Sequence, residues 1–403
     1  MKEKIIFAYS GGLDTSVMLK WLSKKDYEII AYIADVGQKE DFKKVKEKAI
    51  KTGASKVYIK DLKKEFVENY IFEALKANAI YEGKYLLGTA LSRPLIAKKQ
   101  VEIAKIENTK ILAHGCTGKG NDQVRFELIW MQFLPNLKII SPWKEEEWLK
   151  KFEGRKDLIN YAIENNIPID VNLKKSYSID ENLMHISYES GILEKLNNKP
   201  DQSMFKFTKS PKNANDVETD IAIEFLKGIP VKVQNISKNE IISGSLKIMN
   251  FLNDLASVNG IGRTDIVENR FIGIKSRGVY ETPGGAVLIK AHKDLESITL
   301  DKEVIHLKEI IAPIIGKLIY NGFWFSPEMK FLMAAINESQ KKVSGKIFMT
   351  LYKGNITITG RESKYSLYNE SIASMNKQGS FNQKDAAGFI KIIGQRLKLN
   401  GEK

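Results

Sequence analysis

Short apolar runs alternate with longer amphipathic segments along the first 140 residues. The apolar runs predict strands at 4–7, 28–34, 56–59, 110–113 and 137–140, and the amphipathic segments predict helices at 17–22, 41–51, 63–79, 91–107 and 121–133. Strands that alternate with helices indicate a mainly parallel sheet covered on both faces, which is an α/β fold. Ligands of such sheets bind beyond the C-terminal ends of the strands. The loops after residues 9, 34 and 113 are therefore expected to carry a site.

The pattern changes after about residue 166. A helix at 154–166 closes the first domain, and the irregular stretch beyond it carries predicted strands at 221–225, 230–233, 271–274 and 286–289 and a helix at 246–258. This mixture predicts a second, α+β domain. Residues 385–398 predict a terminal helix whose apolar stripe packs on its own domain or on a neighbouring subunit; the stripe consists of Ala386, Ile390, Ile393 and Leu397. We therefore divide the chain into residues 1–166, 167–360 and 361–403.

The first predicted strand runs into a polar turn, Ala8-Tyr9-Ser10-Gly11-Gly12-Leu13-Asp14-Thr15-Ser16, and then into a helix. Two glycines permit unusual backbone torsions and a close approach of a ligand. Free N–H groups at a helix start favour an anion of the phosphate type. The turn matches neither the G-x-x-x-x-G-K-[ST] nor the G-x-G-x-x-G phosphate loop. An ordinary strand-to-helix turn with capping residues is the alternative interpretation.

The loop after the fourth predicted strand is rich in glycine and short polar residues. It contains Thr117, Asn121 and Asp122, and Arg125 follows Asn121 by one helical turn. An Asp can bind an amino group and an Arg can bind a carboxylate with two N–H groups, so the loop suits an amino acid. A flexible surface loop without a ligand is the alternative.

Composition narrows the possible partners. The net charge is +14, from 63 Lys and Arg against 49 Asp and Glu, but the lysines are spread out and mixed with acids. This distribution favours anionic small substrates over nucleic acid. No apolar run approaches the roughly 18 residues that a membrane span needs. Cys116 is the only cysteine, so no internal disulfide is possible and a reducing, cytoplasmic setting is expected.

The first turn has the form S-G-G-x-D-[ST]-S, which resembles the pyrophosphate-binding loop of the ATP pyrophosphatases, a superfamily with an adenine nucleotide α-hydrolase-like fold. Further strings, in order along the chain, resemble the type 1 argininosuccinate synthase family. They begin at residue 5 and continue beyond residue 360, and besides the first turn they include residues 34–38, 85–89, 114–127, 262–270 and 275–285. Several strings in family order are more specific than any one of them.

The resemblance implies an ATP-dependent ligase of arginine biosynthesis. Members condense citrulline with aspartate through a citrullyl-adenylate and release AMP and pyrophosphate. The expected substrates are citrulline, aspartate and ATP, with Mg²⁺ carried by ATP and with no metal held by the protein. The family also implies a homotetramer, in which the C-terminal helix reaches across subunits. Neither nucleic acid nor a membrane is an expected partner.

Roles for single residues follow from the same resemblance. ATP is expected to contact Ala8, Tyr9, Ser10, Gly11, Gly12, Leu13, Asp14, Thr15, Ser16, Ala34 and Gly115, with the hydroxyls of Ser10, Thr15 and Ser16 on the pyrophosphate. Citrulline is expected to contact Tyr85, Thr89, Asn121, Arg125, Ser178, Ser187, Glu268 and Tyr280. Aspartate is expected to contact Thr117, Asn121 and Asp122. No residue is assigned bond-making chemistry; Ser10, Asp122 and Arg125 are expected to act by positioning.

The chain departs from the family pattern at two positions. Ala90 stands where many members have Ser, and we expect the hydroxyl of Thr89 to cover the citrulline contact. Cys116 stands where the family often has Ala, and a small buried residue is the favoured interpretation. Two other functions stay open: a related enzyme that adenylates a tRNA base, and a nucleotide-binding protein without catalytic activity.

Overall fold

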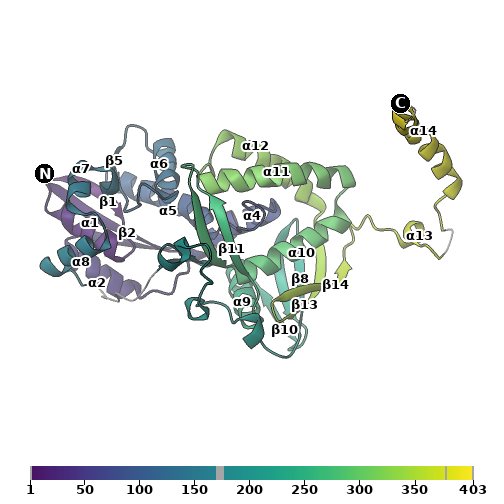
Figure 1. Cartoon of the computed structure of the whole chain (residues 1–403), viewed down its shortest axis with the longest axis horizontal. Coiled ribbons are helices and arrows are strands. Elements are labelled where there is room, and N and C mark those ends of the chain that lie inside the picture. The colour runs from purple at the N-terminus through teal and green to yellow at the C-terminus, as the bar shows by residue number, and fades with distance from the viewer. Residues whose placement is uncertain (1, 169–176, 377–378, 402–403) are drawn as a thin grey trace.

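The structure is a computed structural model that describes residues 2–168, 177–376 and 379–401. Its first part is a parallel sheet in the order β3-β2-β1-β4-β5 (Figure 1). The strands are β1 (Glu3–Ala8), β2 (Tyr27–Asp35), β3 (Lys56–Asp61), β4 (Ile111–Ala113) and β5 (Lys138–Ile140). All four ladders between neighbours are parallel. The α/β expectation for this part of the chain, including its five strands, is confirmed.

Alternating side chains of these strands enter two cores, one on each face of the sheet. Ile5 and Phe7 pack on one face and Ile6 packs on the other, because successive side chains of a strand point to opposite sides. The first face is covered by α1 (Leu13–Ser23), α2 (Phe42–Thr52), α7 (Glu146–Lys151) and α8 (Arg155–Glu164). The second is covered by α5 (Gly88–Ile106) and α6 (Asp122–Phe133). Both faces are thus buried, as near-continuous apolar strands require.

The second part contains two antiparallel sheets. One has the order β10-β9-β8-β13-β14 and the other the order β11-β12-β7-β6. Their strands are β6 (Ser178–Glu181), β7 (Ile186–Glu189), β8 (Thr219–Leu226), β9 (Ile229–Asn235), β10 (Glu240–Ser243), β11 (Arg263–Asn269), β12 (Lys275–Glu281), β13 (Gly345–Tyr352) and β14 (Asn355–Glu362). The helices are α9 (Ser245–Val258), α10 (Pro283–Thr299), α11 (Lys302–Asn321), α12 (Pro327–Ser339), α13 (Glu370–Ala373) and α14 (Gln383–Gly401).

Two sequence predictions for this part are wrong. Residues 271–274 form the turn between β11 and β12 rather than a strand. Residues 286–289 lie inside α10, although the run Ala-Val-Leu-Ile is typical of a strand. A short apolar run does not by itself distinguish a buried strand from a buried helix. Here Pro283 begins the helix and packing against α9 buries Val287 and Leu288.

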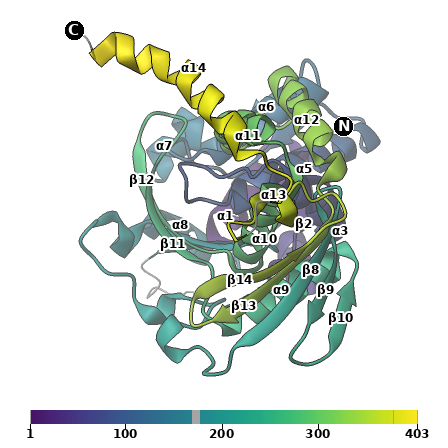
Figure 2. The ribbon, with the colours of Figure 1, turned by 90° about the vertical axis from the view of Figure 1, so that its right-hand side faces the viewer.

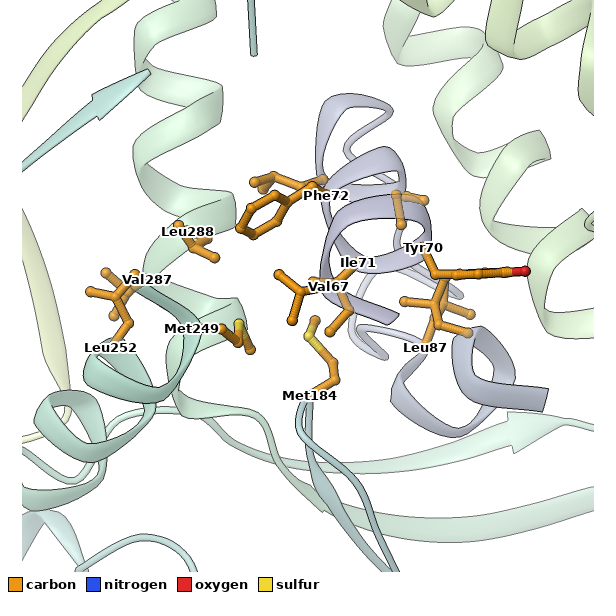
Figure 3. Close-up of a cluster of buried hydrophobic side chains, with 14 of the residues drawn as sticks. Val67, Tyr70, Ile71, Phe72, Leu87, Met184, Met249, Leu252, Val287 and Leu288 are labelled. Carbon is orange, nitrogen blue, oxygen red and sulfur yellow. The ribbon is translucent and has the colours of Figure 1, made fainter. Parts of the chain in front are cut away.

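A third core joins the two parts. The predicted helix at 63–79 is realised as α3 (Lys63–Phe66), the π-helical η1 (Val67–Ile71) and α4 (Phe72–Lys76). Side chains of these helices pack with those of α9 and α10, and Met184 lies in the same cluster (Figure 3). The segment therefore leaves the parallel sheet and lies in the core of the second part. The division at residue 166 stays a prediction.

The last helix lies apart from the rest of the molecule. In Figures 1 and 2, α14 extends away from the body, and none of its residues is buried. The short helices not yet given are η2 (Pro142–Lys144), η3 (Gly191–Glu194), η4 (Gln202–Met204), η5 (Pro211–Asn213) and η6 (Gln340–Lys342). Within the described residues, no helix combines the length and the apolar composition that crossing a bilayer demands.

Candidate active site

The turn after β1 has the geometry of an anion site. Gly11 has a φ of +77°, and a Cβ there would come within 2.9 Å of Val45. Gly12 precedes α1 and caps it with no side-chain hydrogen bond, so the first N–H groups of the helix are not taken by a cap. The Ser10 and Thr15 hydroxyls lie 3.0 Å apart at the same end of the helix. The uncapped start of the helix and two hydroxyls thus lie together, as phosphate binding requires.

Ser16 takes a different place from its neighbours. It is fully buried, and its hydroxyl lies 2.9 Å from the hydroxyl of Tyr9 and 3.4 Å from the carbonyl oxygen of Gly11. The other predicted ATP residues, from Ala8 to Thr15 together with Ala34 and Gly115, line an open cleft, and Ser16 does not. Ser16 therefore supports the loop from behind in this structure.

This cleft has a volume of about 1940 Å³ and lies at the C-terminal edge of the parallel sheet. Besides the ATP residues, its walls contain every residue predicted for the two amino acids: Tyr85, Thr89, Thr117, Asn121, Asp122, Arg125, Ser178, Ser187, Glu268 and Tyr280. The strings that carry the resemblance are thus brought together from both parts of the chain.

Asp122 begins α6 and lies between two guanidinium groups. Arg93 Nε donates to Asp122 Oδ2 at 2.9 Å, and Arg125 Nη1 donates to Oδ1 at 2.8 Å. Burial by itself would raise the pKa of Asp122, but Arg93 and Arg125 hold it below the ordinary value. Asp122 is therefore a carboxylate at neutral pH. Beside it, Asn121 Oδ1 accepts a hydrogen bond from the main-chain N–H of Phe271 at 3.0 Å, in the turn between β11 and β12.

Glu268 on β11 is the centre of an aromatic cluster. Tyr280 donates to Glu268 Oε2 at 2.7 Å, and Tyr320 donates to Oε1 at 2.6 Å. The rings of Tyr85 and Tyr280 stack with their centroids 4.3 Å apart. Arg125 donates from Nε and Nη2 to the carbonyl oxygen of Tyr320, at 2.9 and 2.7 Å. One N–H on each terminal nitrogen of Arg125 still remains for a ligand.

Thr89 and the hairpin of β6 and β7 continue the wall of this aromatic cluster, since the N–H of Thr89 donates to the hydroxyl of Tyr85 at 3.1 Å. The Thr89 hydroxyl lies 2.9 Å from both Asp180 Oδ2 and His185 Nε2. The Ser187 hydroxyl is 3.4 Å from the carbonyl oxygen of Asp180, and Ser178 lies two residues before Asp180 on β6. Ala90 is fully buried in the core, so the hydroxyl at this point of the wall is that of Thr89.

His114, in the loop that follows β4, is held by hydrogen bonds within the protein. His114 is buried, its Nε2 lies 2.8 Å from Glu127, and its Nδ1 accepts from the N–H of Cys116 at 3.2 Å. Cys116 is half-buried and lines the cleft, so the expectation of a buried residue is met only in part. Burial raises the pKa of its thiol well above the ordinary value, so the thiol is protonated at neutral pH. Among residues that the structure describes, no group of three His, Cys, Asp or Glu side chains is arranged to hold a metal ion.

The sequence analysis did not predict several residues that bond the predicted site residues, among them Arg93, Asp180, His185 and Tyr320. Two of them left a signal, because Arg93 follows Thr89 by one helical turn and Asp180 follows Ser178 by two strand residues. Such spacings place the pairs on common faces. His185 and Tyr320 left none, since a buried His or Tyr beside apolar residues is usual for a core.

Comparisons with known proteins agree with this geometry. Residues 4–168 match the arginosuccinate synthase N-terminal HUP domain, and residues 177–400 match the arginosuccinate synthase C-terminal domain. The chain is 59% identical over 400 residues to the argininosuccinate synthase of Thermotoga maritima, covering 99% of this chain and 98% of that protein. It is 50% identical over 397 residues to the Xenopus laevis argininosuccinate synthase, covering 98% and 97%, and to the Rattus norvegicus enzyme, covering 98% and 96%.

Fold and site together define a nucleotide-binding protein of the HUP class with a second domain that completes the cleft. The chain belongs to the argininosuccinate synthase family. The resemblance seen in the sequence strings is thereby confirmed, as are the fold class and the ligase prediction, and the tRNA-modifying alternative is not favoured.

A solved structure from Methanocaldococcus jannaschii, titled as a predicted subunit of tRNA methyltransferase, is 19% identical to this chain with a TM-score of 0.26. The match covers 40% of this chain and 76% of that one, and it supports no statement about function.

Proposed function

We propose that the chain condenses citrulline with aspartate to argininosuccinate, through a citrullyl-adenylate, with release of AMP and pyrophosphate. The observation that carries the proposal is the single cleft in which an anion-binding turn meets two sets of groups suited to amino acids. A ureido carbon is a poor electrophile and its oxygen a poor leaving group, so adenylation has to precede attack by the amine. The three partners must therefore share one site, and the cleft offers walls for all three.

The ATP end of the site binds mainly through backbone and hydroxyl groups. The N–H groups at the start of α1 and the hydroxyls of Ser10 and Thr15 hold the pyrophosphate portion, where negative charge grows as it departs. The backbones of Ala34 and Gly115 contact the nucleotide. Mg²⁺ is proposed to enter with ATP, held by phosphate oxygens, and to neutralise their charge.

The citrulline end presents one carboxylate and one guanidinium group in fixed positions. Glu268 accepts hydrogen bonds from two tyrosine hydroxyls and keeps lone pairs for the ammonium group of citrulline. The remaining N–H groups of Arg125 bind the carboxylate of citrulline. Tyr85 and Tyr280 form the wall between them. Because these groups are already oriented by each other, binding costs little reorganisation, and the ureido oxygen is directed toward the α-phosphate.

The aspartate end depends on Asp122, with Thr117 and Asn121 beside it. A carboxylate whose pKa is lowered binds the ammonium of aspartate well but removes its proton poorly. Asp122 therefore positions the amine next to the activated carbon. In this proposal the protein contributes mostly by positioning and by stabilising charge.

We further propose a cytoplasmic homotetramer in which α14 packs on another subunit. The support is the exposed apolar face of this helix, where Ile390, Ile393 and Leu397 are each more than half exposed. An isolated helix with such a face is unfavourable in water unless a partner covers it.

The test is release of pyrophosphate from ATP with citrulline and aspartate together, and then with each omitted. Formation of AMP and argininosuccinate in equal amounts, only when both amino acids are present, is the expected result. In a parallel reaction, unmodified tRNA replaces the two amino acids. Release with tRNA and none with the amino acids would overturn the proposal.

A further inference from the structure

Asp180 on β6 connects groups that belong to different substrate sites. Its Oδ2 accepts a hydrogen bond from Thr89, at 2.9 Å, and another from Arg93 Nη2, at 2.7 Å. Thr89 belongs to the proposed citrulline wall. Arg93 uses its Nε to hold Asp122, the proposed ligand of the aspartate ammonium. A single carboxylate from the second part of the chain thus fixes two side chains that begin in α5 of the first.

Arg93 is held firmly between the two carboxylates. Its side chain is 15% exposed. Burial by itself would lower its pKa, but Asp122 and Asp180 raise it above the ordinary value, so the guanidinium stays charged. A planar guanidinium with one carboxylate at Nε and another at Nη2 has a fixed orientation. A shift of Asp180 is therefore transmitted to Asp122 through a rigid group.

His185 fixes the other arm of the connection. The Thr89 hydroxyl has one hydrogen, which it donates to Asp180, so it must accept from His185 Nε2–H. Burial lowers the pKa of His185 to about 4, and its Nδ1 is buried without a partner among the described residues, as expected for the neutral ring protonated at Nε2. The ring lies parallel to Tyr280 in the citrulline wall, with an interplanar angle of 10°.

We propose that Asp180 is a positioning residue shared by the citrulline and aspartate sites, acting on the first through Thr89 and on the second through Arg93. The inference rests on the proposed function. It predicts that loss of the Asp180 charge weakens use of both amino acids, whereas damage to one arm weakens use of only one. A residue needed only for folding would show no such division.

The test measures two partial activities of the full-length protein. Citrulline-dependent exchange between ATP and pyrophosphate, without aspartate, reports the citrulline KM; argininosuccinate synthesis at saturating citrulline reports the aspartate KM. For Asp180→Asn both KM values should rise about tenfold, since one charge-assisted hydrogen bond is lost in each arm. Thr89→Val should raise the citrulline KM alone. Arg93→Lys should raise the aspartate KM and leave exchange within about threefold of the wild type, because lysine cannot bridge both carboxylates.

Asp294→Asn is the matched control, because Asp294 forms a two-point ion pair with Arg361 and neither residue lines the cleft. Its KM values should equal those of the wild type. Should Asp180→Asn fail to fold, Asp180→Glu keeps the charge but displaces it, and both KM values must again rise. A change in only one KM, or in neither, overturns the proposal. A wild type without citrulline-dependent exchange would instead overturn the proposed function.

Discussion

Replacement of Asp122 by asparagine separates the two chemical steps. The change removes the charge that the proposed site offers to the ammonium of aspartate, and it touches no group assigned to ATP. It also removes the carboxylate partner of Arg125, whose two hydrogen bonds to Tyr320 remain. A hydrogen bond to a charged group contributes about 1.5–3 kcal/mol. The expected loss of kcat/KM for aspartate is therefore about 10- to 100-fold, at about 1.4 kcal/mol for each factor of ten.

The structure also bounds the effect of this change on stability. Each guanidinium that holds Asp122 keeps a second acceptor, since Arg93 still binds Asp180 and Arg125 still binds the carbonyl oxygen of Tyr320. Arg93 keeps a carboxylate partner, whereas buried Arg125 loses the one with which it forms an ion pair and keeps only the carbonyl oxygen. We therefore expect the free energy of unfolding to fall by about 3–5 kcal/mol, as when a buried ion pair loses one partner.

The assay compares citrulline-dependent exchange between ATP and pyrophosphate with argininosuccinate synthesis. Exchange by Asp122→Asn should fall much less than synthesis, because Arg125 loses one hydrogen bond but keeps the two that orient it on Tyr320. Asp254→Asn, in an exposed position of α9, is the control and should change neither. If exchange falls as far as synthesis, Asp122 does not act on aspartate specifically and the assignment is refuted.

Three further predictions concern the cluster around Glu268, the core and the assembly. Tyr320→Phe removes one of two hydroxyls on Glu268 and should raise the citrulline KM about tenfold without changing the aspartate KM; equal changes in both would contradict the role. Burial lowers the pKa of His292 to about 4, so between pH 6.5 and 4 the unfolded state binds the proton and the folded state does not. Stability should therefore fall as pH falls, by up to about 1.4 kcal/mol per pH unit for this group in urea unfolding. Light scattering should give a tetramer, and removal of residues 383–403 should reduce its size; a monomer of 45.7 kDa before truncation would exclude the assembly.

Local signals determined much of this protein. The alternation of apolar runs and amphipathic segments predicted the parallel sheet, because strands buried on both faces need continuous apolar side chains and crossover helices need one apolar stripe. The Gly-Gly turn and the Thr117 to Arg125 loop could be found because their residue types are costly in regular structure and suit anions and amino acids. The strings shared with a known family then identified the ligase.

The tertiary structure decided what depends on contacts between distant segments. Residues 286–289 became helix because α9 buries one face of α10. The 63–76 segment packs in the third core, although it begins in the first part of the chain. Asp180 lies 87 residues from Arg93, and Tyr320 lies 52 residues from Glu268, yet each pair shares a hydrogen bond. The chain order contains the residue types but not these distances. Side-chain orientation at the site is likewise set by packing: Ser16 is buried against Tyr9 behind the loop, while its neighbours line the cleft.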